Sequence, residues 1–311
     1  AFDRFFFGRE PLDGADPGGR LKLVQKDIRD VEPEDLAGVD AVCDLAALSN
    51  DPSGEIDPGL THAINHAGRR RLSGAAKRAG VGRYVLSSSC SVYGAGDTLE
   101  LDETAPTAPL TAYAESTLHA ECDALALTGD GFSPVVLRNA TVFGVSPRMR
   151  FDLVINLMTL HAVERGHITV MGGGRQWRPL VHVADVARAF RAAIDAPAAR
   201  VAGQVFNVGL CNHQIRSLAF IVRETLPIPV TVAIAPDDAD RRDYSISFAK
   251  ARDGLGFVAR TGIEDGVREI YDALKYGRVE NGPKTVTVGW YRSILEAKRL
   301  LSAVELNGRV L

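Results

Sequence analysis

The chain has 311 residues, of which 46% are hydrophobic, and a formal net charge of -3. This length and composition allow a sizeable core, expected as two lobes around one cleft. The slightly acidic balance argues against a broad nucleic-acid or anionic-membrane surface. The four cysteines include no Cys-x-x-Cys pair, which argues against a metal site. No apolar run reaches the ~18 residues that span a membrane, and the N-terminus has no signal-like pattern. Together these features favour a cytoplasmic protein.

Residues 1–40 lack the strand, glycine-rich turn and helix with which a dinucleotide-binding fold opens. The segment "AFDRFFFG" (1–8) has the pattern of the end of a second strand instead. The glycines of "PLDGADPGGR" (11–20) follow no apolar strand and precede no helix. We therefore expect that a first βα unit, on the order of 30 residues, is missing from the sequence.

Three short apolar segments come next, and each predicts a buried strand because glycine, proline or polar residues bound it: 39–48, 82–94 and 133–144. A helix that ends at Gly80 separates the first two, and a helix that contains Tyr113 separates the last two. The first helix carries a basic run that we interpret as a solvated face: Arg69, Arg70 and Arg71. This β-α-β-α-β order predicts an α/β protein with a doubly wound parallel sheet.

Past residue 147 the pattern loosens into mixed α/β units. We interpret residues 1–147 as a nucleotide-binding domain, to which residues 176–210 return. Residues 148–311 then form a smaller, discontinuous substrate lobe. The ending 289–306 is amphipathic and predicts core packing, with a partner-facing helix as the alternative; its stripe consists of Trp290, Ile294, Leu295 and Leu301.

Several motifs occur in one order along the chain: "LAALSND" (45–51), "SSSCSVYG" (87–94), "YAEST" (113–117) and "RQWRPLVHVADVA" (175–187). Together they resemble the extended short-chain dehydrogenase/reductase family, in its branch of NAD-dependent nucleotide-sugar epimerases and dehydratases. The resemblance implies a Rossmann-like fold, NAD as cofactor and a nucleoside-diphosphate sugar as substrate. It also implies a homodimer, formed by the helices at 61–79 and 112–128.

On the cofactor side, the resemblance places Asp3 where the family's acidic residue holds the adenosine ribose. A carboxylate there would repel a 2′-phosphate, which favours NAD over NADP. Asn65 matches an asparagine that steadies the turn near the active site, with a helix-surface asparagine as the alternative. The family's residues beside the adenine and in the small-residue turn under the cofactor correspond to Asp27, Ile28, Ala46 and Ala47.

The catalytic residues that the resemblance implies are Ser89, Tyr113 and the residue at position 117. A serine hydroxyl both donates and accepts, so Ser89 suits a proton relay. Tyr113 would be the general acid and base, which the family activates with a lysine one helical turn away. This chain has Thr117 there. We expect weakened catalysis, because the positive ring of bound NAD⁺ would still favour the phenolate.

On the substrate side, Ser91 lies in the sugar pocket of the family. Dehydratases of the family place acidic residues where Cys90 and Ser91 stand, so dehydration is disfavoured. Guanidinium groups suit a diphosphate because they form paired hydrogen bonds. The residues that the resemblance assigns to the diphosphate are Asn156, Leu157, Arg178 and Arg242; His182 and Asp185 fit the same motifs but are interpreted as structural.

The sequence therefore predicts an NAD-dependent nucleotide-sugar epimerase that oxidises and re-reduces a ring carbon, expected to be C4. A dehydratase or a simple reductase is the alternative among enzymes. A non-catalytic sugar-nucleotide-binding relative, motivated by Thr117 and the missing glycine-rich turn, is the alternative outside them.

Overall fold

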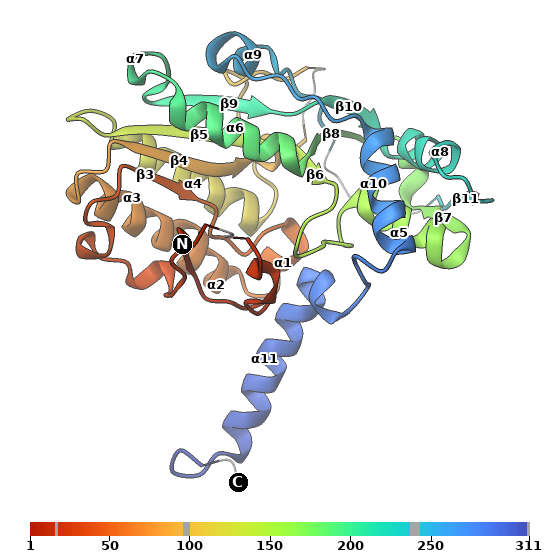
Figure 1. The fold of residues 1–311 in the computed structure, drawn as a ribbon, viewed down its shortest axis with the longest axis horizontal. Coiled ribbons are helices and arrows are strands. Elements are labelled where there is room, and N and C mark those ends of the chain that lie inside the picture. Colours follow the sequence, from red (N-terminus) through yellow and green to blue (C-terminus); the bar gives the residue numbers. More distant parts are fainter. Residues whose placement is uncertain (16–17, 96–99, 237–242, 310–311) are drawn as a thin grey trace.

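The computed structural model describes residues 1–15, 18–95, 100–236 and 243–309. It has a main α/β body, a smaller lobe beside it and a C-terminal helix that extends away from both (Figure 1). Within the described residues, no helix combines the length and the apolar character that a membrane crossing requires.

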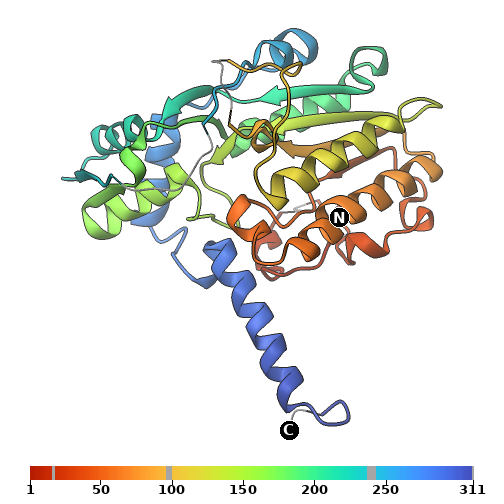
Figure 2. The same ribbon diagram turned by 180° about the vertical axis from the view of Figure 1, so that it is seen from behind.

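The main sheet has four parallel strands in the order β3-β4-β5-β9: Ala41–Asp44, Arg83–Ser89, Ser133–Asn139 and Gln204–Val208. Helices α3 (Arg69–Arg78) and α4 (Ala112–Ala126) cover one face, and α6 (Val183–Asp195) covers the other (Figures 1 and 2). Every residue of β5 is buried, as expected for a strand with helices on both sides. The predicted doubly wound parallel sheet is confirmed.

The chain reaches α3 through one continuous helical stretch, formed by α2 (Pro58–His62) and the π-helical segment Ala63–Gly68. The predicted helix therefore exists, and it ends beside Gly80, whose φ of 79° is the left-handed conformation that favours glycine. Two further short helices are α1 (Asp51–Gly54) and α7 (Ala198–Val201). Single turns of 3-10 helix lie at Glu10–Leu12, Ile28–Asp30, Pro33–Leu36, Cys90–Tyr93, Gly172–Gly174 and Pro283–Thr285.

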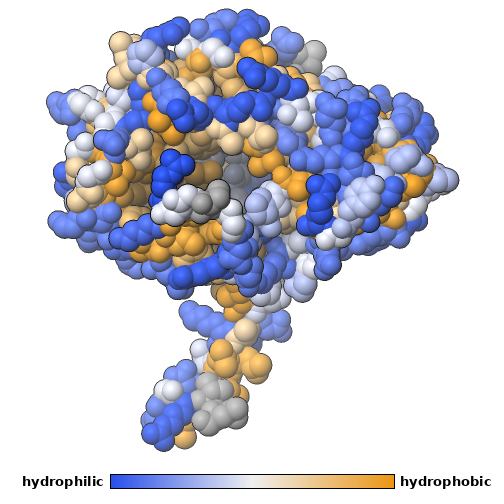
Figure 3. Space-filling model, in the orientation of Figure 1, coloured by the Kyte–Doolittle hydropathy of each residue, from blue (hydrophilic) through white to orange (hydrophobic). Residues whose placement is uncertain are grey.

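The N-terminal strands form a sheet of their own. Strand β1 (Phe2–Asp3) pairs in parallel with β2 (Val24–Gln25), and the described residues join neither to β3. Along the edge strand β3, Val42 and Asp44 are buried, whereas Cys43 is exposed and Leu45, just past the strand, is 60% exposed. Figure 3 shows this side of the molecule hollowed, with hydrophobic residues around the hollow. Within the described residues, one face of β3 thus lacks the cover that a doubly wound sheet normally has.

The smaller lobe packs three helices around a pair of parallel strands. The strands are β7 (His167–Val170) and β11 (Thr231–Ile234), and the helices are α5 (Val154–Arg165), α8 (Ile215–Thr225) and α10 (Ile263–Lys275). A mixed three-stranded sheet joins lobe and body, with the order β10 (Cys211–Gln214), β8 (Trp177–His182) and β6 (Thr141–Phe143). Helix α9 (Ala249–Leu255) lies back on β9, where Ala251 and Phe257 share a core with Phe206.

The C-terminal helix α11 (Thr287–Val304) differs from its prediction. Only Thr287 is buried along this helix, and Leu295 and Leu301 are 36% and 47% exposed. Figures 1 and 2 show the helix leaving the body at its first turn, where Trp290 is half-buried and donates to the backbone oxygen of Phe6; the rest of the apolar stripe meets no core in the described residues. The prediction of core packing is therefore wrong, and a partner-facing helix stays a prediction.

A buried ion pair joins α4 to the main sheet. Arg138 on β5 donates to both carboxylate oxygens of Glu121, with an Nη2–Oε2 distance of 2.8 Å, and its Nη1 donates to Tyr93. Ser88 donates to the same carboxylate. The side chains of Arg138 and Glu121 are only 7% and 2% exposed. Each charge therefore depends on the other for the hydrogen bonds that water would otherwise supply.

Arg138→Met should destabilise the fold by about 3–5 kcal/mol, because it leaves the Glu121 carboxylate buried without its partner. Urea unfolding measures this change, and Arg191→Met in the exposed pair with Asp195 is the matched control, with a loss below about 1 kcal/mol. Adding Glu121→Leu should recover much of the loss. Equal, small losses in Arg138→Met and Arg191→Met would show that the buried pair is not needed.

Candidate active site

The predicted catalytic residues lie at the carboxyl ends of the parallel strands, where open α/β sheets bind their ligands. Ser89 is the last residue of β4, and its Oγ accepts from the backbone N of Ser91 at 3.1 Å. Tyr113 lies in the first turn of α4, which begins there because the Thr111 side chain caps it. The strand end and the helix start thus bring two hydroxyl groups to one place.

The Ser89 hydroxyl lies near enough to the Tyr113 phenol to lower the pKa of that phenol. One helical turn on, Thr117 is 1% exposed, and its Oγ1 has no hydrogen-bond partner within the part of the chain that the structure describes. The same holds for the Oγ of Ser91, which is 5% exposed. Buried hydroxyls are rarely left unpaired, so these two mark places where a ligand can supply the partner.

Burial and nearby side chains shift the pKa of Tyr113 in opposite directions. Burial, and then the Asp51 carboxylate, raise this pKa, whereas Arg69, the hydrogen bond with Ser89, and Arg150 lower it. The raising influences prevail. The phenol is therefore protonated at neutral pH unless a further positive charge comes close.

Asp51 was not predicted as a site residue, although it closes the "LAALSND" motif. It is 8% exposed, and its Oδ1 accepts from the Thr111 hydroxyl at 2.6 Å. This contact spans 60 residues of sequence and joins α1 to the cap of α4. No local spacing signals such a contact, so the sequence could not show that a carboxylate lies beside Tyr113.

The basic run on α3 is only partly the solvated face that was predicted. Arg70 is 71% exposed and Arg71 is 41% exposed at the side chain, but Arg69 is 3% exposed. The Arg69 Nε donates to the backbone oxygen of Ala46 at 2.9 Å and lies 3.5 Å from Asp44. The prediction is wrong for Arg69, because the helix turns this one side chain toward the end of β3.

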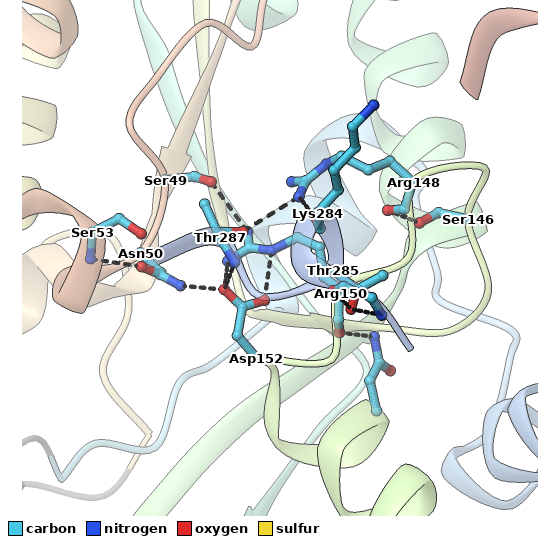
Figure 4. Close-up of polar contacts among 12 residues, drawn as sticks. Ser49, Asn50, Ser53, Ser146, Arg148, Arg150, Asp152, Lys284, Thr285 and Thr287 are labelled. Atoms are coloured by element: carbon cyan, nitrogen blue, oxygen red, sulfur yellow. Dashed lines mark hydrogen bonds and ion pairs between the residues drawn. The ribbon is translucent and has the colours of Figure 1, made fainter. Parts of the chain in front are cut away.

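Arg150 belongs to a polar cluster that Figure 4 shows between the body and the start of α11. Its guanidinium makes two hydrogen bonds of 3.0 Å to Asp152 and a third, of 3.1 Å, to Ser49. Asp152 also accepts from Asn50 at 3.0 Å and from the backbone N of Thr287 at 3.2 Å. One carboxylate thus ties together the loop after β3, the loop before α5 and the C-terminal helix.

Buried side chains hold the small-residue turn after β3 in place. The Oδ1 of Asn65 accepts from the backbone N of Leu48 at 2.8 Å, and its Nδ2 donates to the oxygen of Leu48 at 3.1 Å. Asn65 is fully buried, so the alternative of a helix-surface asparagine is wrong. Ala46 accepts from Arg69, and Ala47 continues the turn without a bulky side chain.

The residues assigned to the adenosine end of NAD make different side-chain contacts. Asp3 is exposed at the end of β1, and its carboxylate accepts from the backbone N of Phe5. Asp27 is bound by Arg29 and Arg4, and the Arg29 hydrogen bond holds the pKa of that carboxyl well below its usual range. Ile28 packs against Gly68, where an added Cβ would lie 2.8 Å from it.

Of the residues assigned to the diphosphate, Asn156 and Leu157 lie in the first turn of α5 and Arg178 lies on β8. Asn156 accepts from Gly144 and donates to the oxygen of Arg150, so its amide holds the loop between these two residues in place. The backbone N of Leu157 donates to Leu153 within α5. Arg178 is 6% exposed and donates to the oxygen of Trp177. Arg242 lies outside the described residues.

The two residues interpreted as structural have structural contacts. The Nε2 of His182 lies 2.8 Å from a Glu269 carboxylate oxygen, and its Nδ1 accepts from Ala184 at the start of α6. Asp185 is fully buried and accepts from the backbone N of Arg260 and of Thr261.

Gly54, at the end of α1, lies directly against Tyr113, the predicted general acid and base. A Cβ at this glycine would lie 2.8 Å from the Cβ of Tyr113 and 3.1 Å from its backbone N. Gly54→Ala must therefore shift the start of α4 and should lower kcat about ten- to a hundredfold, since small misplacements are costly to catalysis. Gly59→Ala is the control, because its Cβ would meet only the Asp57 carboxylate at 3.4 Å. Steady-state kinetics that show equal activity in both variants would contradict this contact.

The chain belongs to the NAD-dependent epimerase/dehydratase family, whose model matches residues 11–209. It is similar to the dTDP-glucose 4,6-dehydratase of Actinoplanes sp., with 30% identity over 286 residues that cover 90% of this chain and 82% of that protein. It is also similar to the UDP-glucose 4-epimerase of Azospirillum brasilense, with 31% identity over 203 residues that cover 58% of this chain and 56% of that protein. Among solved structures, MoeE5 in complex with UDP-glucose and NAD matches with a TM-score of 0.76 and 26% identity, covering 89% of this chain and 98% of that chain.

Proposed function

We propose that this protein is an NAD-dependent nucleotide-sugar epimerase that inverts C4 of a nucleoside-diphosphate hexose. The observation that carries the proposal is the proximity of Ser89, at the carboxyl end of β4, to Tyr113, in the first turn of α4, with no carboxylate at positions 90 and 91. Such a pair removes and returns a hydroxyl proton, which is what oxidation and re-reduction of a carbinol require from the protein.

The residues around the pair fit a bound dinucleotide. The hydroxyls of Thr117 and Ser91 are buried without partners in the described part of the chain, the turn at Ala46 and Ala47 is small enough for close approach, and Asp3 presents an exposed carboxylate. NAD, when bound, accepts a hydride from a substrate carbon and returns it. Asp3 would accept from the hydroxyls of the adenosine ribose and repel a 2′-phosphate.

Proton transfer falls to Tyr113, with Ser89 between the phenol and the sugar hydroxyl. Arg69 and Arg150 lower the pKa of Tyr113 and supply part of the positive charge that the lysine of the resembling enzymes would give. Their charge does not outweigh burial and Asp51. The proposed enzyme is therefore active, but slower at neutral pH than one with an ammonium at position 117.

The residue at position 90 argues against dehydration. Cys90 is 1% exposed, its Sγ donates to the oxygen of Arg138 at 3.3 Å, and burial raises the pKa of this thiol. A neutral thiol that points into the core removes no C5 proton. The alternative, a 4,6-dehydratase, draws support from the Actinoplanes relative and from the Asp51 carboxylate beside Tyr113.

Product analysis tests the proposal. Purified protein is incubated with NAD and with UDP-, dTDP- and GDP-linked hexoses, and the products are identified by proton NMR. A C4 epimer with an intact C6 hydroxymethyl group is expected. A 4-keto-6-deoxy sugar would overturn the proposal in favour of the dehydratase, and binding without any product would favour the non-catalytic relative.

A further inference from the structure

Three histidines from two neighbouring helical segments converge on the outer side of the body, on the face of these helices away from the sheet. His62 ends α2, His66 follows one turn later in the π-helical segment, and His119 lies on α4. One ring nitrogen from each lies within 4.8 Å of the others. The ring centroids of His66 and His119 are 5.1 Å apart, and those of His62 and His119 are 6.2 Å apart.

The helical spacing makes this convergence possible. Residues i and i+4 share one face of a helix, so His62 and His66 point the same way from one segment. Segment Ala63–Gly68 packs against α4, which places His119 opposite both. The imidazoles are accessible: the side chains of His62 and His66 are 35% and 29% exposed, and His119 is exposed.

Carboxylates complete the surroundings of the three rings. Asp123, one turn after His119 on α4, has its Oδ2 2.8 Å from the Nε2 of His66. Glu115, one turn before His119, lies 3.8 Å from the Nε2 of His62. Arg70 lies 3.9 Å from Asp123. A histidine that binds a metal through one ring nitrogen commonly bonds a carboxylate through the other, which fixes the ring orientation.

We propose that His62, His66 and His119 form a binding site for a divalent transition metal, with Zn²⁺ as the preferred ion and Asp123 as the residue that orients His66. Three imidazoles suit Zn²⁺, and three protein ligands leave one position for water. Zn–N distances of about 2.0–2.1 Å require nitrogens about 3.4 Å apart in a tetrahedral site. Side-chain rotations would have to bring the three nitrogens from within 4.8 Å of one another to that spacing.

The ion would connect two elements of the candidate active site. The segment that carries His66 also carries Asn65, which holds the turn after β3, and α4 carries Tyr113. Metal binding therefore stabilises the packing of α4 without touching the reacting groups. This inference does not depend on the reaction that the protein catalyses.

Calorimetric titration of the chelator-treated full chain with ZnCl₂ tests the site, with Co²⁺ absorption spectra as the second readout. We expect one ion per chain, a higher melting temperature with Zn²⁺, and tetrahedral Co²⁺ bands without a thiolate charge-transfer band. His119→Ala should weaken binding at least tenfold. Asp123→Asn should weaken it about ten- to a hundredfold. His161→Ala, on the partly exposed side of α5, is the matched control and should bind like the native chain.

Three outcomes would overturn the site. Native affinity in His119→Ala, with far-UV circular dichroism showing a folded protein, would place the ion elsewhere. A thiolate band would assign it to a cysteine such as Cys122, which is exposed on the same helix. One ion per two chains would make it a contact between copies and not a site within one chain.

Discussion

Tyr113→Phe is expected to lower kcat about 10²–10⁴-fold, the usual contribution of a positioned general acid and base. The substitution removes only the phenolic oxygen near Ser89, so the ring remains and the Cβ and backbone of Tyr113 keep their contact with Gly54. Steady-state kinetics with the identified nucleotide sugar measure the effect. Affinity for the nucleotide sugar should change little, because the residues proposed to contact the diphosphate lie on other elements, α5 and β8.

The control for this variant is Tyr271→Phe, which removes a hydroxyl from a partly buried tyrosine on α10. It should retain native activity. Turnover that survives Tyr113→Phe would remove the phenol from the mechanism and assign proton transfer to another group, with Asp51 as the next residue to test.

Thr117→Lys is expected to raise activity near neutral pH by tenfold or more. The ammonium would lie one helical turn from Tyr113 and favour the phenolate, and one unit of pKa corresponds to about 1.4 kcal/mol, or tenfold. A general base acts in its deprotonated form. A lower pKa of Tyr113 therefore increases the fraction of active enzyme at pH values below the native pKa. The rising limb of the pH profile should therefore move to lower pH.

The comparison that isolates the charge is Thr117→Met, which adds similar length without an ammonium. Thr117 is 1% exposed, so both variants introduce volume into a buried position, and the lysine variant adds the desolvation cost of its ammonium. Only the lysine variant should gain activity. If both variants lose activity equally, the threonine belongs to a different arrangement and its hydroxyl is needed as it stands.

The sequence identified the parts of this protein that follow from local pattern. Strands β4 and β5, the helix that ends beside Gly80 and the helix that carries Tyr113 all lie within the predicted segments. The strands β4 and β5 end at Ser89 and Asn139, before the predicted ends at residues 94 and 144. Ser89 and Tyr113 were assigned to one site by the family resemblance of two motifs, one at the end of β4 and one at the start of α4.

The missed features depend on contacts between distant segments. Arg69 was expected in solvent, because three consecutive arginines do not show which one turns inward. Arg150 reaches Ser49 across 101 residues, and Asp51 reaches Thr111 across 60. The stripe of α11 predicted burial, but periodicity shows only that a helix has an apolar side and not what lies opposite.

The most direct test of C4 epimerisation is the fate of hydrogen on carbon when the reaction runs in D₂O. Inversion by oxidation and re-reduction at C4 leaves every C–H bond of the product free of solvent deuterium, because the proton that Tyr113 exchanges is bound to oxygen. Dehydration removes the C5 proton and replaces it from solvent. NMR and mass spectrometry of the isolated product should therefore show a C4 epimer without carbon-bound deuterium. Deuterium at C5 would contradict the account.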